Sequence, residues 1–273
     1  MTILITGGSG FIGSKLVTFL KNQGQEVIVF QGDITEPDSF NRYQGSRVEA
    51  VIHLAGKTSG RPTSDFFRIN SQGANNVTEF CHRQEVGRLI FFSSIKVLSK
   101  LNNPYIVSKR KAEEIIAGSG VPYVIIRPSL VYGPGDSKNI GRLINLAGKL
   151  PVLPVSNIKF QPVYLDDLLE AVLGCLKIAP NRVVNLAGLE TIAVVDILRI
   201  LKGQGFKARP LVLPKIFNRL IWLLALLPFS PLPAWQVKSL LDSEEFTGDD
   251  WPIIFNIKPT FFKEGLIKTL NQI

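Results

Sequence analysis

The sequence has few of the residues that a disulfide-stabilised or metal-binding protein needs. Its 273 residues include two cysteines, Cys81 and Cys175, and two histidines, His53 and His82. The cysteines form no CxxC pair and the histidines are scattered, which argues against a disulfide framework and against a metal site. So few cysteines suit a reducing compartment, and the apolar start Met1–Ile5 lacks the charged region of a signal peptide. We therefore expect a cytoplasmic protein without a bound metal.

Long hydrophobic runs are also missing. The strongly apolar stretch 216–227 is interrupted by Asn218 and Arg219, and it falls short of the roughly 20 residues that a membrane span needs. We expect a helix that packs on the rest of the protein. The alternative is a surface-lying anchor, helped by Lys215 and Arg219, that makes peripheral membrane contact.

Positive charge is in excess, with 31 Lys and Arg against 22 Asp and Glu and a net charge of +9. Nucleic-acid-binding proteins usually concentrate basic residues in a stripe or tail with interleaved aromatic residues. Here the basic residues are spread along the chain, and the densest cluster is Lys109-Arg110-Lys111. We therefore expect no nucleic-acid partner, whereas anionic small molecules such as diphosphates suit this charge.

Short apolar runs alternate with helical patterns in the first half of the chain. Strands are expected at residues 2–6, 25–30, 50–54, 88–93, 122–127 and 183–186, and helices at 14–22, 66–84 and 104–117. This alternation predicts an α/β fold with a Rossmann-type doubly wound parallel sheet. We expect residues 1–128 to form this domain, with a later strand near 183–187 rejoining the sheet. Residues 129–273 would mostly form a smaller C-terminal substrate-binding lobe.

A glycine-rich turn, Thr6-Gly7-Gly8-Ser9-Gly10-Phe11-Ile12-Gly13, joins the first expected strand to the first helix. In this context each glycine has a physical role. Gly7 permits a tight turn, Gly10 lets a pyrophosphate approach the backbone, and Gly13 allows the helix to pack closely on the strand. The free N–H groups at the start of the helix then favour phosphate groups. The turn predicts a dinucleotide site.

Tyr105 and Lys109 stand four residues apart on an expected helix, so both side chains lie on one face. A tyrosine with its ordinary pKa of about 10 is a poor base at neutral pH. A nearby lysine ammonium group stabilises the phenolate and makes proton exchange easier. The pair therefore predicts acid–base chemistry.

The GxxGxxG spacing resembles that of the extended and atypical short-chain dehydrogenase/reductases, the superfamily of the NAD-dependent epimerases and dehydratases. The resemblance extends over almost the whole chain, through residues 51–56, 70–73, 90–94, 105–109 and 126–135. It implies that Tyr105 exchanges a proton while a hydride passes between substrate and nicotinamide, and that Lys109 also holds the nicotinamide ribose. It further implies that Ser94 binds the substrate oxygen, with Ser93 as the alternative.

The resemblance implies a cofactor, NAD or NADP, and the residues that contact it. These are Gly7, Gly10, Phe11, Ile12, Gly13, Leu54, Ala55, Gly56, Lys109 and Pro128, with Gln31, Asp33 and Ile34 toward the adenosine end. An acidic residue usually ends the second strand and binds the adenosine ribose, but here Gln31 stands there. Asp33 has nearly the expected spacing, yet Gly32-Asp33-Ile34 also resembles a family segment that contacts adenine. No arginine is an obvious replacement, so the choice between NAD and NADP stays open.

The second half bears on the substrate. Nucleotide-sugar epimerases typically carry a diphosphate-binding arginine where this chain has Phe160 or Gln161, and Lys159 replaces it only imperfectly. Residues 160–164, 231–237 and 256–260 instead resemble the branch of the NADPH-binding accessory subunit of respiratory complex I.

Three functions follow as hypotheses. The first is a nucleotide-sugar epimerase or keto-reductase, with a homodimer as a possible state. The others are a dinucleotide-binding accessory or assembly protein and a reductase of an apolar ketone.

Overall fold

The computed structural model describes residues 1–272 except residues 157, 215, 228–232 and 242–243. Lys215 and residues 231–232 therefore lie outside the described residues. The chain forms two compact units, which are taken in turn. Unit 1 comprises residues 1–128, 168–186 and 249–257, and unit 2 comprises residues 129–167, 187–248 and 258–273.

Unit 1 is built on a six-stranded sheet with the order β10-β5-β4-β3-β1-β2. All neighbouring strands in it are parallel. The strands are β1 (Thr2–Thr6), β2 (Glu26–Val29), β3 (Ala50–His53), β4 (Arg88–Phe92), β5 (Tyr123–Pro128) and β10 (Arg182–Leu186). The predicted doubly wound parallel sheet is confirmed.

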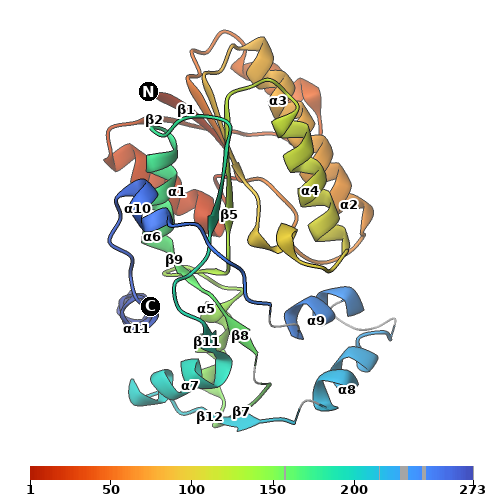
Figure 1. Cartoon of the computed structure of the whole chain (residues 1–273), viewed down its shortest axis with the longest axis vertical. Helices are drawn as coiled ribbons and strands as arrows, with labels where there is room; N and C mark the ends of the chain where they lie inside the picture. Colours follow the sequence, from red (N-terminus) through yellow and green to blue (C-terminus); the bar gives the residue numbers. More distant parts are fainter. Residues whose placement is uncertain (157, 215, 228–232, 242–243, 273) are drawn as a thin grey trace. The chain divides into compact units, whose positions relative to one another are not determined.

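Helices cover both faces of this sheet, with α1 and α6 on one side and α3 and α4 on the other (Figure 1). The helical segments are α1 (Phe11–Asn22), η1 (Pro37–Tyr43), α2 (Ser64–Phe66), η2 (Phe67–Gln72), α3 (Gly73–Arg83), η3 (Ile95–Leu98), α4 (Pro104–Ala117), α6 (Leu165–Cys175) and α10 (Trp251–Phe255). The single helix expected over residues 66–84 is instead an α-helical turn, a π-helical segment and the helix α3.

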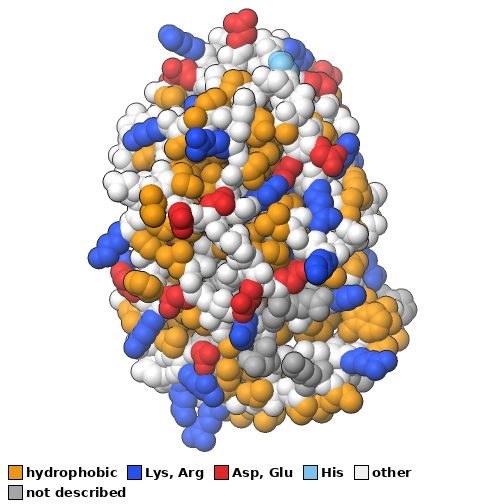
Figure 2. All heavy atoms as spheres, in the orientation of Figure 1, with side chains coloured by type: hydrophobic (Ala, Val, Ile, Leu, Met, Phe, Trp, Pro, Cys, Tyr) orange, Lys and Arg blue, Asp and Glu red, His pale blue; other side chains and the backbone are white. Residues whose placement is uncertain are grey.

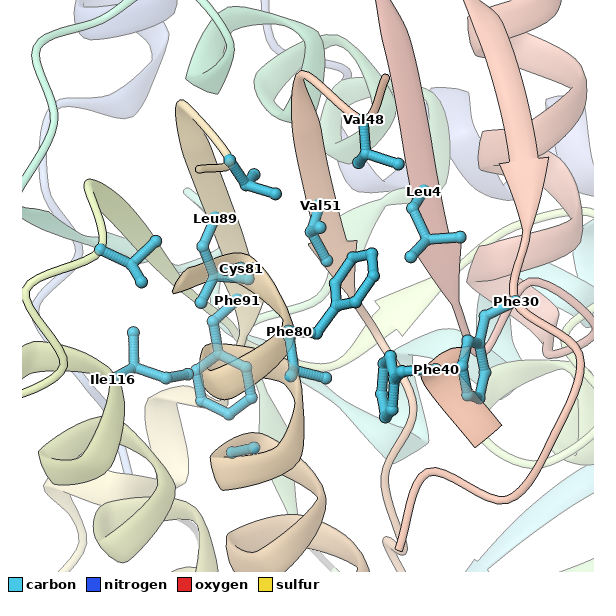
Figure 3. Close-up of a cluster of buried hydrophobic side chains, with 14 of the residues drawn as sticks. Leu4, Phe30, Phe40, Val48, Val51, Phe80, Cys81, Leu89, Phe91 and Ile116 are labelled. Atoms are coloured by element: carbon cyan, nitrogen blue, oxygen red, sulfur yellow. The ribbon is translucent and has the colours of Figure 1, made fainter. Parts of the chain in front are cut away.

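The core of unit 1 on the α3 and α4 side consists of aliphatic and aromatic side chains from the sheet, α3, α4 and η1. Figure 3 shows Leu4, Val51 and Phe91 of the strands facing Phe80 of α3 and Phe40 of η1. Phe40 and Phe80 are at most 1% exposed, and their ring centres lie 5.3 Å apart. Both cysteines are free and buried within unit 1.

Unit 2 has smaller sheets than unit 1. Its strands form three two-stranded pairs, β6 with β9, β11 with β8 and β12 with β7. The strands are β6 (Val131–Tyr132), β7 (Val152–Val155), β8 (Lys159–Phe160), β9 (Val163–Tyr164), β11 (Ile192–Ala193) and β12 (Arg209–Val212). The helices are α5 (Ile140–Lys149), α7 (Val194–Gly203), α8 (Ile216–Leu224), α9 (Ala234–Leu241) and α11 (Phe262–Leu270). Their core centres on Tyr132, Tyr164 and Phe262.

Helix α8 differs from the prediction that residues 216–227 pack on the rest of the protein. Seven apolar side chains of α8 and of the residues just after it are 39–74% exposed: Ile216, Phe217, Ile221, Leu223, Leu224, Leu226 and Leu227. Ala225 is buried, and α8 lies against α9. An apolar sequence pattern favours a helix but does not show whether another element covers it, so the expectation of packing was wrong for these side chains.

The surface charges are dispersed. Figure 2 shows Lys and Arg side chains spread over the visible face and interleaved with Asp and Glu. Within the described residues, no helix combines the length and the apolar character needed to cross a membrane. In the same part of the chain, His, Cys, Asp and Glu side chains form no group of three or more that could hold a metal ion.

Candidate active site

The predicted site residues follow the carboxyl ends of neighbouring strands in unit 1. The glycine turn follows β1, residues 54–56 follow β3, Ser94 lies two residues after β4, and Pro128 ends β5. Because all these strands are parallel, their carboxyl ends meet at one edge of the sheet, where doubly wound folds bind their ligands. Pro128 is buried there, paired in register with Leu186 of β10.

The glycine turn is shaped for close packing and for a bound phosphate. Gly7 has a φ of +72°, and a Cβ on it would lie 2.6 Å from the Ala55 nitrogen. A Cβ on Gly13 would overlap the Gly7 carbonyl oxygen. A Cβ on Gly10 would meet only that oxygen, at 3.4 Å, so Gly10 faces open space. The turn therefore leaves a cradle in front of Gly10 that a side chain would fill.

The start of α1 presents free donors to that cradle. Gly10 is the N-cap of α1, with no side-chain cap and no acidic residue in the first turn. Phe11 and Ile12 therefore lie in the first turn, where backbone N–H groups and the helix dipole favour an anion. These residues fit the pyrophosphate of a dinucleotide.

The segment after β3 connects the turn to the catalytic residues. Leu54 N–H donates to the Thr6 carbonyl oxygen at 3.2 Å, and Ala55 N–H lies 3.3 Å from the Thr6 hydroxyl. A Cβ on Gly56 would lie 3.0 Å from Asn70 Oδ1 and 3.4 Å from Lys109 Nζ. Gly56 therefore allows Lys109 and Asn70 to approach this backbone.

Buried His53, at the end of β3, is part of the core rather than an acid–base group. Its Nδ1 lies 2.7 Å from the Thr6 hydroxyl, and its ring stacks on Phe91. Burial, and then the charge of Lys109, lower the pKa of His53 to about 3. The ring is therefore neutral at physiological pH.

Helix α4 carries Tyr105 and Lys109 and is fixed at both ends. Asn103 caps its start, with Oδ1 accepting from the Ile106 N–H at 2.9 Å. Further along, the Glu113 carboxylate accepts from Arg127 Nε at 2.9 Å and Nη2 at 2.6 Å, which ties α4 to β5. A partly buried, bidentate pair of this kind holds the helix in one position.

Lys109 is 4% exposed and donates from Nζ to the Phe92 carbonyl oxygen at 2.7 Å. The same nitrogen lies 4.6 Å from the centre of the Phe91 ring. Burial lowers the pKa of Lys109 to about 8, while the charge of Glu113 acts in the opposite direction. The ammonium group is thus held at the end of β4, on the residue that precedes Ser93 and Ser94.

Ser93 and Ser94 differ in their surroundings. Burial raises the pKa of Tyr105, and a side-chain hydrogen bond with Ser94 partly offsets this effect. Ser94 Oγ also accepts from the Lys96 N–H at 3.3 Å. Ser93 Oγ is buried and has no hydrogen-bond partner among the described residues. The effect of Ser94 on the pKa of Tyr105 favours Ser94 over Ser93 as its partner, and the catalytic roles stay predictions.

Asn70 is a site residue that the sequence analysis did not single out. From η2, its Oδ1 accepts from the Lys57 N–H at 2.8 Å, and its Nδ2 donates to the Lys57 carbonyl at 3.1 Å and the Ser108 hydroxyl at 2.9 Å. The amide therefore joins the loop after β3 to the helix of Tyr105. Its only signal in the sequence was membership of the motif at residues 70–73.

At the adenosine end the predicted residues separate. Gln31 is exposed, just beyond β2. The Asp33 carboxylate accepts from the Thr35 N–H and hydroxyl, both at 2.8 Å, and these bonds lower the pKa of Asp33. The Ile34 side chain is 7% exposed and packs in the core. An arginine that the sequence analysis missed, Arg42, donates to the Gln31 carbonyl oxygen at 3.2 Å.

Lys109 leads to a pH prediction. Between its folded pKa of about 8 and its ordinary value of 10.5, the unfolded chain binds more protons than the folded chain. The free energy of unfolding therefore gains a contribution that rises with pH across this window. We expect Lys109→Met to remove this rise of the unfolding free energy with pH, when the free energy is measured by urea unfolding between about pH 7 and 10. Equal slopes for both proteins would contradict the lowered pKa.

The sequence and the fold match proteins of known chemistry. The family model described as the NAD dependent epimerase/dehydratase family matches residues 3–187. The chain is similar to a ceramide reductase from Caulobacter vibrioides, with 33% identity over 171 residues that cover 56% of this chain and 53% of that protein. It is also similar to a UDP-glucose 4-epimerase from Vibrio cholerae, with 27% identity over 218 residues that cover 64% and 66%. The chain therefore spans about half to two thirds of the length of these two relatives.

Among solved structures, a UDP-glucose 4-epimerase from Thermotoga maritima, determined with UDP-glucose, has a TM-score of 0.81. The alignment covers 100% of this chain and 98% of that chain, with 21% sequence identity. At this identity the likeness shows a shared Rossmann-type epimerase fold and no more.

Proposed function

Because the chain belongs to the NAD-dependent epimerase/dehydratase family, we propose that it is an oxidoreductase acting on a secondary alcohol or ketone with NAD or NADP. One observation carries the proposal. Buried Lys109 shares helix α4 with Tyr105 and donates from Nζ to the Phe92 carbonyl oxygen at 2.7 Å, at the end of the strand that leads to Ser94. Gly56 lets Lys109 lie close to the backbone of residues 54–56, and the same backbone packs on the glycine turn at Gly7.

The side chains of unit 1 suit carbonyl reduction and its reverse. When bound, the nicotinamide supplies or accepts the hydride. In the reducing direction, Ser94 donates a hydrogen bond to the substrate carbonyl oxygen, and Tyr105 gives its phenolic proton to that oxygen. The resulting phenolate is stabilised by the Lys109 ammonium group. Lys109 would also hold the nicotinamide ribose, as the resemblance to the family implies.

Nucleotide-linked sugars are the first candidate substrates, in a 4-epimerase or 4-keto-reductase reaction. The family membership supports this class. The test uses a panel of UDP-, GDP- and dTDP-sugars and their keto forms. A 4-epimerase converts a sugar nucleotide into its epimer with no net change in the cofactor, so its product is measured by chromatography, whereas a 4-keto-reductase is measured by NAD(P)H oxidation with the keto forms. Turnover of one sugar nucleotide would establish the class, and no turnover of any sugar in the panel would count against it.

An apolar ketone is the second candidate, and an observation in unit 2 favours it. Gln161 stands near the position of the diphosphate-binding arginine, but its amide donates to the Phe246 carbonyl at 3.0 Å and accepts from the Phe246 N–H at 2.8 Å. Lys159 lies 3.7 Å from the Glu245 carboxylate. Both side chains therefore interact with residues 245–246, so they are less available to bind a diphosphate. Long-chain 3-oxo acids and ceramide-type ketones belong in the same panel.

The exposed α8 surface would suit such a substrate by contacting an acidic membrane. Helix α8 and the residues after it expose seven large apolar side chains, and Arg219 among them is exposed as well. We expect the full chain to cosediment with vesicles containing phosphatidylserine, and Phe217→Glu with Leu224→Glu to lower the bound fraction severalfold by removing apolar contact. Leu189→Glu with Leu211→Glu, at two leucines 56% and 53% exposed elsewhere in unit 2, is the matched control with the same added charge. Equal binding of the two variants would contradict membrane contact by α8.

Two expectations from the sequence complete the proposal. The two free, buried cysteines suit a reducing compartment such as the cytoplasm. A homodimer is expected from the resemblance to the epimerases, and light scattering after gel filtration measures it directly.

A further inference from the structure

Strand β2, one of the two edge strands of the unit 1 sheet, ends at a position that decides which dinucleotide fits. In this fold, an acidic side chain after the second strand binds the adenosine ribose of NAD, whereas a nearby arginine accommodates the 2′-phosphate of NADP. Here the residue is Gln31, which is exposed and carries no charge. The phosphate turn lies beside the same strand, since a Cβ on Gly8 would be 2.8 Å from Val29 Cγ1.

Asp33 carries the carboxylate closest to Gln31 in the sequence, but this carboxylate already accepts hydrogen bonds within its own turn. Its Oδ1 accepts two hydrogen bonds from Thr35, and its Oδ2 lies 3.8 Å from Arg68 Nη1. These contacts stabilise the segment between β2 and η1. A ribose hydroxyl would displace a Thr35 bond at Oδ1, and at Oδ2 it would meet a carboxylate oxygen that lies beside the charge of Arg68.

Tyr43, the residue after Arg42, holds Arg42 near the end of β2. The Gln31 N–H donates to the Tyr43 hydroxyl at 2.6 Å, and the Tyr43 ring is 7% exposed and lies 5.4 Å from the Phe30 ring. This contact fixes the end of η1 against the end of β2. Arg42 then reaches the Gln31 carbonyl oxygen through Nη1.

The guanidinium group of Arg42 keeps donors for a ligand. Its Nη1 makes one hydrogen bond, to a neutral carbonyl oxygen, and in the described part of the chain no carboxylate lies within ion-pair distance of it. A planar guanidinium group with free N–H donors suits a phosphate better than a lysine does, because it binds two oxygens at once.

We propose that Arg42, with the neutral Gln31, selects the 2′-phosphorylated dinucleotide, so that the protein uses NADP(H) in preference to NAD(H). The inference rests on the proposed function in one respect: it takes the dinucleotide to lie on the turn Gly7–Gly13. A carboxylate at residue 31 would repel a 2′-phosphate, and Gln31 does not. Arg42 adds a charge-assisted contact that a 2′-hydroxyl cannot match.

Nicotinamide fluorescence of the full chain titrated with NADPH and with NADH measures this selection without any substrate. We expect NADPH to bind at least about tenfold more tightly, the usual effect of a hydrogen bond to a charged group. Arg42→Ala should lose about tenfold in NADPH affinity and leave NADH affinity unchanged. Gln31→Asp should weaken NADPH and strengthen NADH. Added salt should weaken NADPH binding more than NADH binding.

Controls separate this inference from the proposed function. Arg47→Ala removes an exposed arginine five residues further on and should change neither affinity. Equal affinity of the wild type for both cofactors would overturn the inference. So would an equal loss for both cofactors in Arg42→Ala, because Arg42 would then only support the end of β2. No binding of either cofactor would instead contradict the proposed function itself.

Discussion

Replacing Tyr105 by Phe is expected to lower the turnover number by about 10²–10⁴-fold, the usual contribution of a positioned acid or base. The change removes one atom, the phenolic oxygen that carries the exchanged proton in the proposed reaction. The affinity for the dinucleotide should not change, because the phosphate turn and Lys109 are untouched. The measurement is NADPH oxidation with a panel substrate that the wild type turns over, together with a fluorescence titration of the cofactor.

Tyr123→Phe is the matched control for this experiment. Tyr123 begins β5 in the same unit, and its described hydrogen bonds involve only backbone atoms of the residue. We expect wild-type turnover for this variant. A Tyr105→Phe variant that keeps its rate would contradict the role of Tyr105, whereas a loss of cofactor affinity alongside the loss of rate would point to a disturbed fold.

Gly13→Ala should lower both stability and cofactor binding. The new Cβ would overlap the Gly7 carbonyl oxygen and also approach Gly8 Cα, at 2.9 Å, so the turn or the start of α1 must shift. Forcing an extra methyl into a closely packed position costs roughly 1–3 kcal/mol. The displaced N–H groups at the start of α1 would no longer face the phosphates. Urea unfolding measures the first effect and NADPH titration the second.

Gly10→Ala separates the two effects. A Cβ there has only the Gly7 carbonyl oxygen within 4 Å, at 3.4 Å, so the fold should tolerate it. Because the methyl group would stand in the phosphate cradle, we expect affinity for the dinucleotide to fall at least about tenfold with little change in unfolding free energy. If Gly13→Ala leaves stability unchanged, or Gly10→Ala leaves affinity unchanged, the described turn does not act as proposed.

The fold could be predicted because its signals are local. Buried parallel strands read as short apolar runs, and the glycine turn and α4 have start signals in adjacent residues. The family assignment from motifs was confirmed by the match over residues 3–187. The placement of Tyr105 and Lys109 on one helix followed from their spacing, and the structure has α4 at Pro104–Ala117 as expected.

The features that escaped prediction depend on contacts between residues distant in sequence. Arg42 reaches Gln31 only because Tyr43 bonds to the end of β2, eleven residues or more away. Asn70 joins Lys57, which precedes it in the sequence, to Ser108, which follows it by 38 residues. Helix α8 was expected to be covered, and nothing in an apolar run shows whether a partner surface exists.

Dinucleotide binding, on which the proposed chemistry and the cofactor preference both depend, is tested most directly by thermal unfolding of the full chain with NAD, NADH, NADP and NADPH. A ligand that binds only the folded state at a hundredfold excess over its Kd stabilises it by about 2.7 kcal/mol. For a chain of this size that raises Tm by about 5 to 10 °C. We predict such a rise with NADPH and NADP and a smaller one with NADH and NAD. No rise with any of the four would contradict the assignment of the glycine turn as a dinucleotide site.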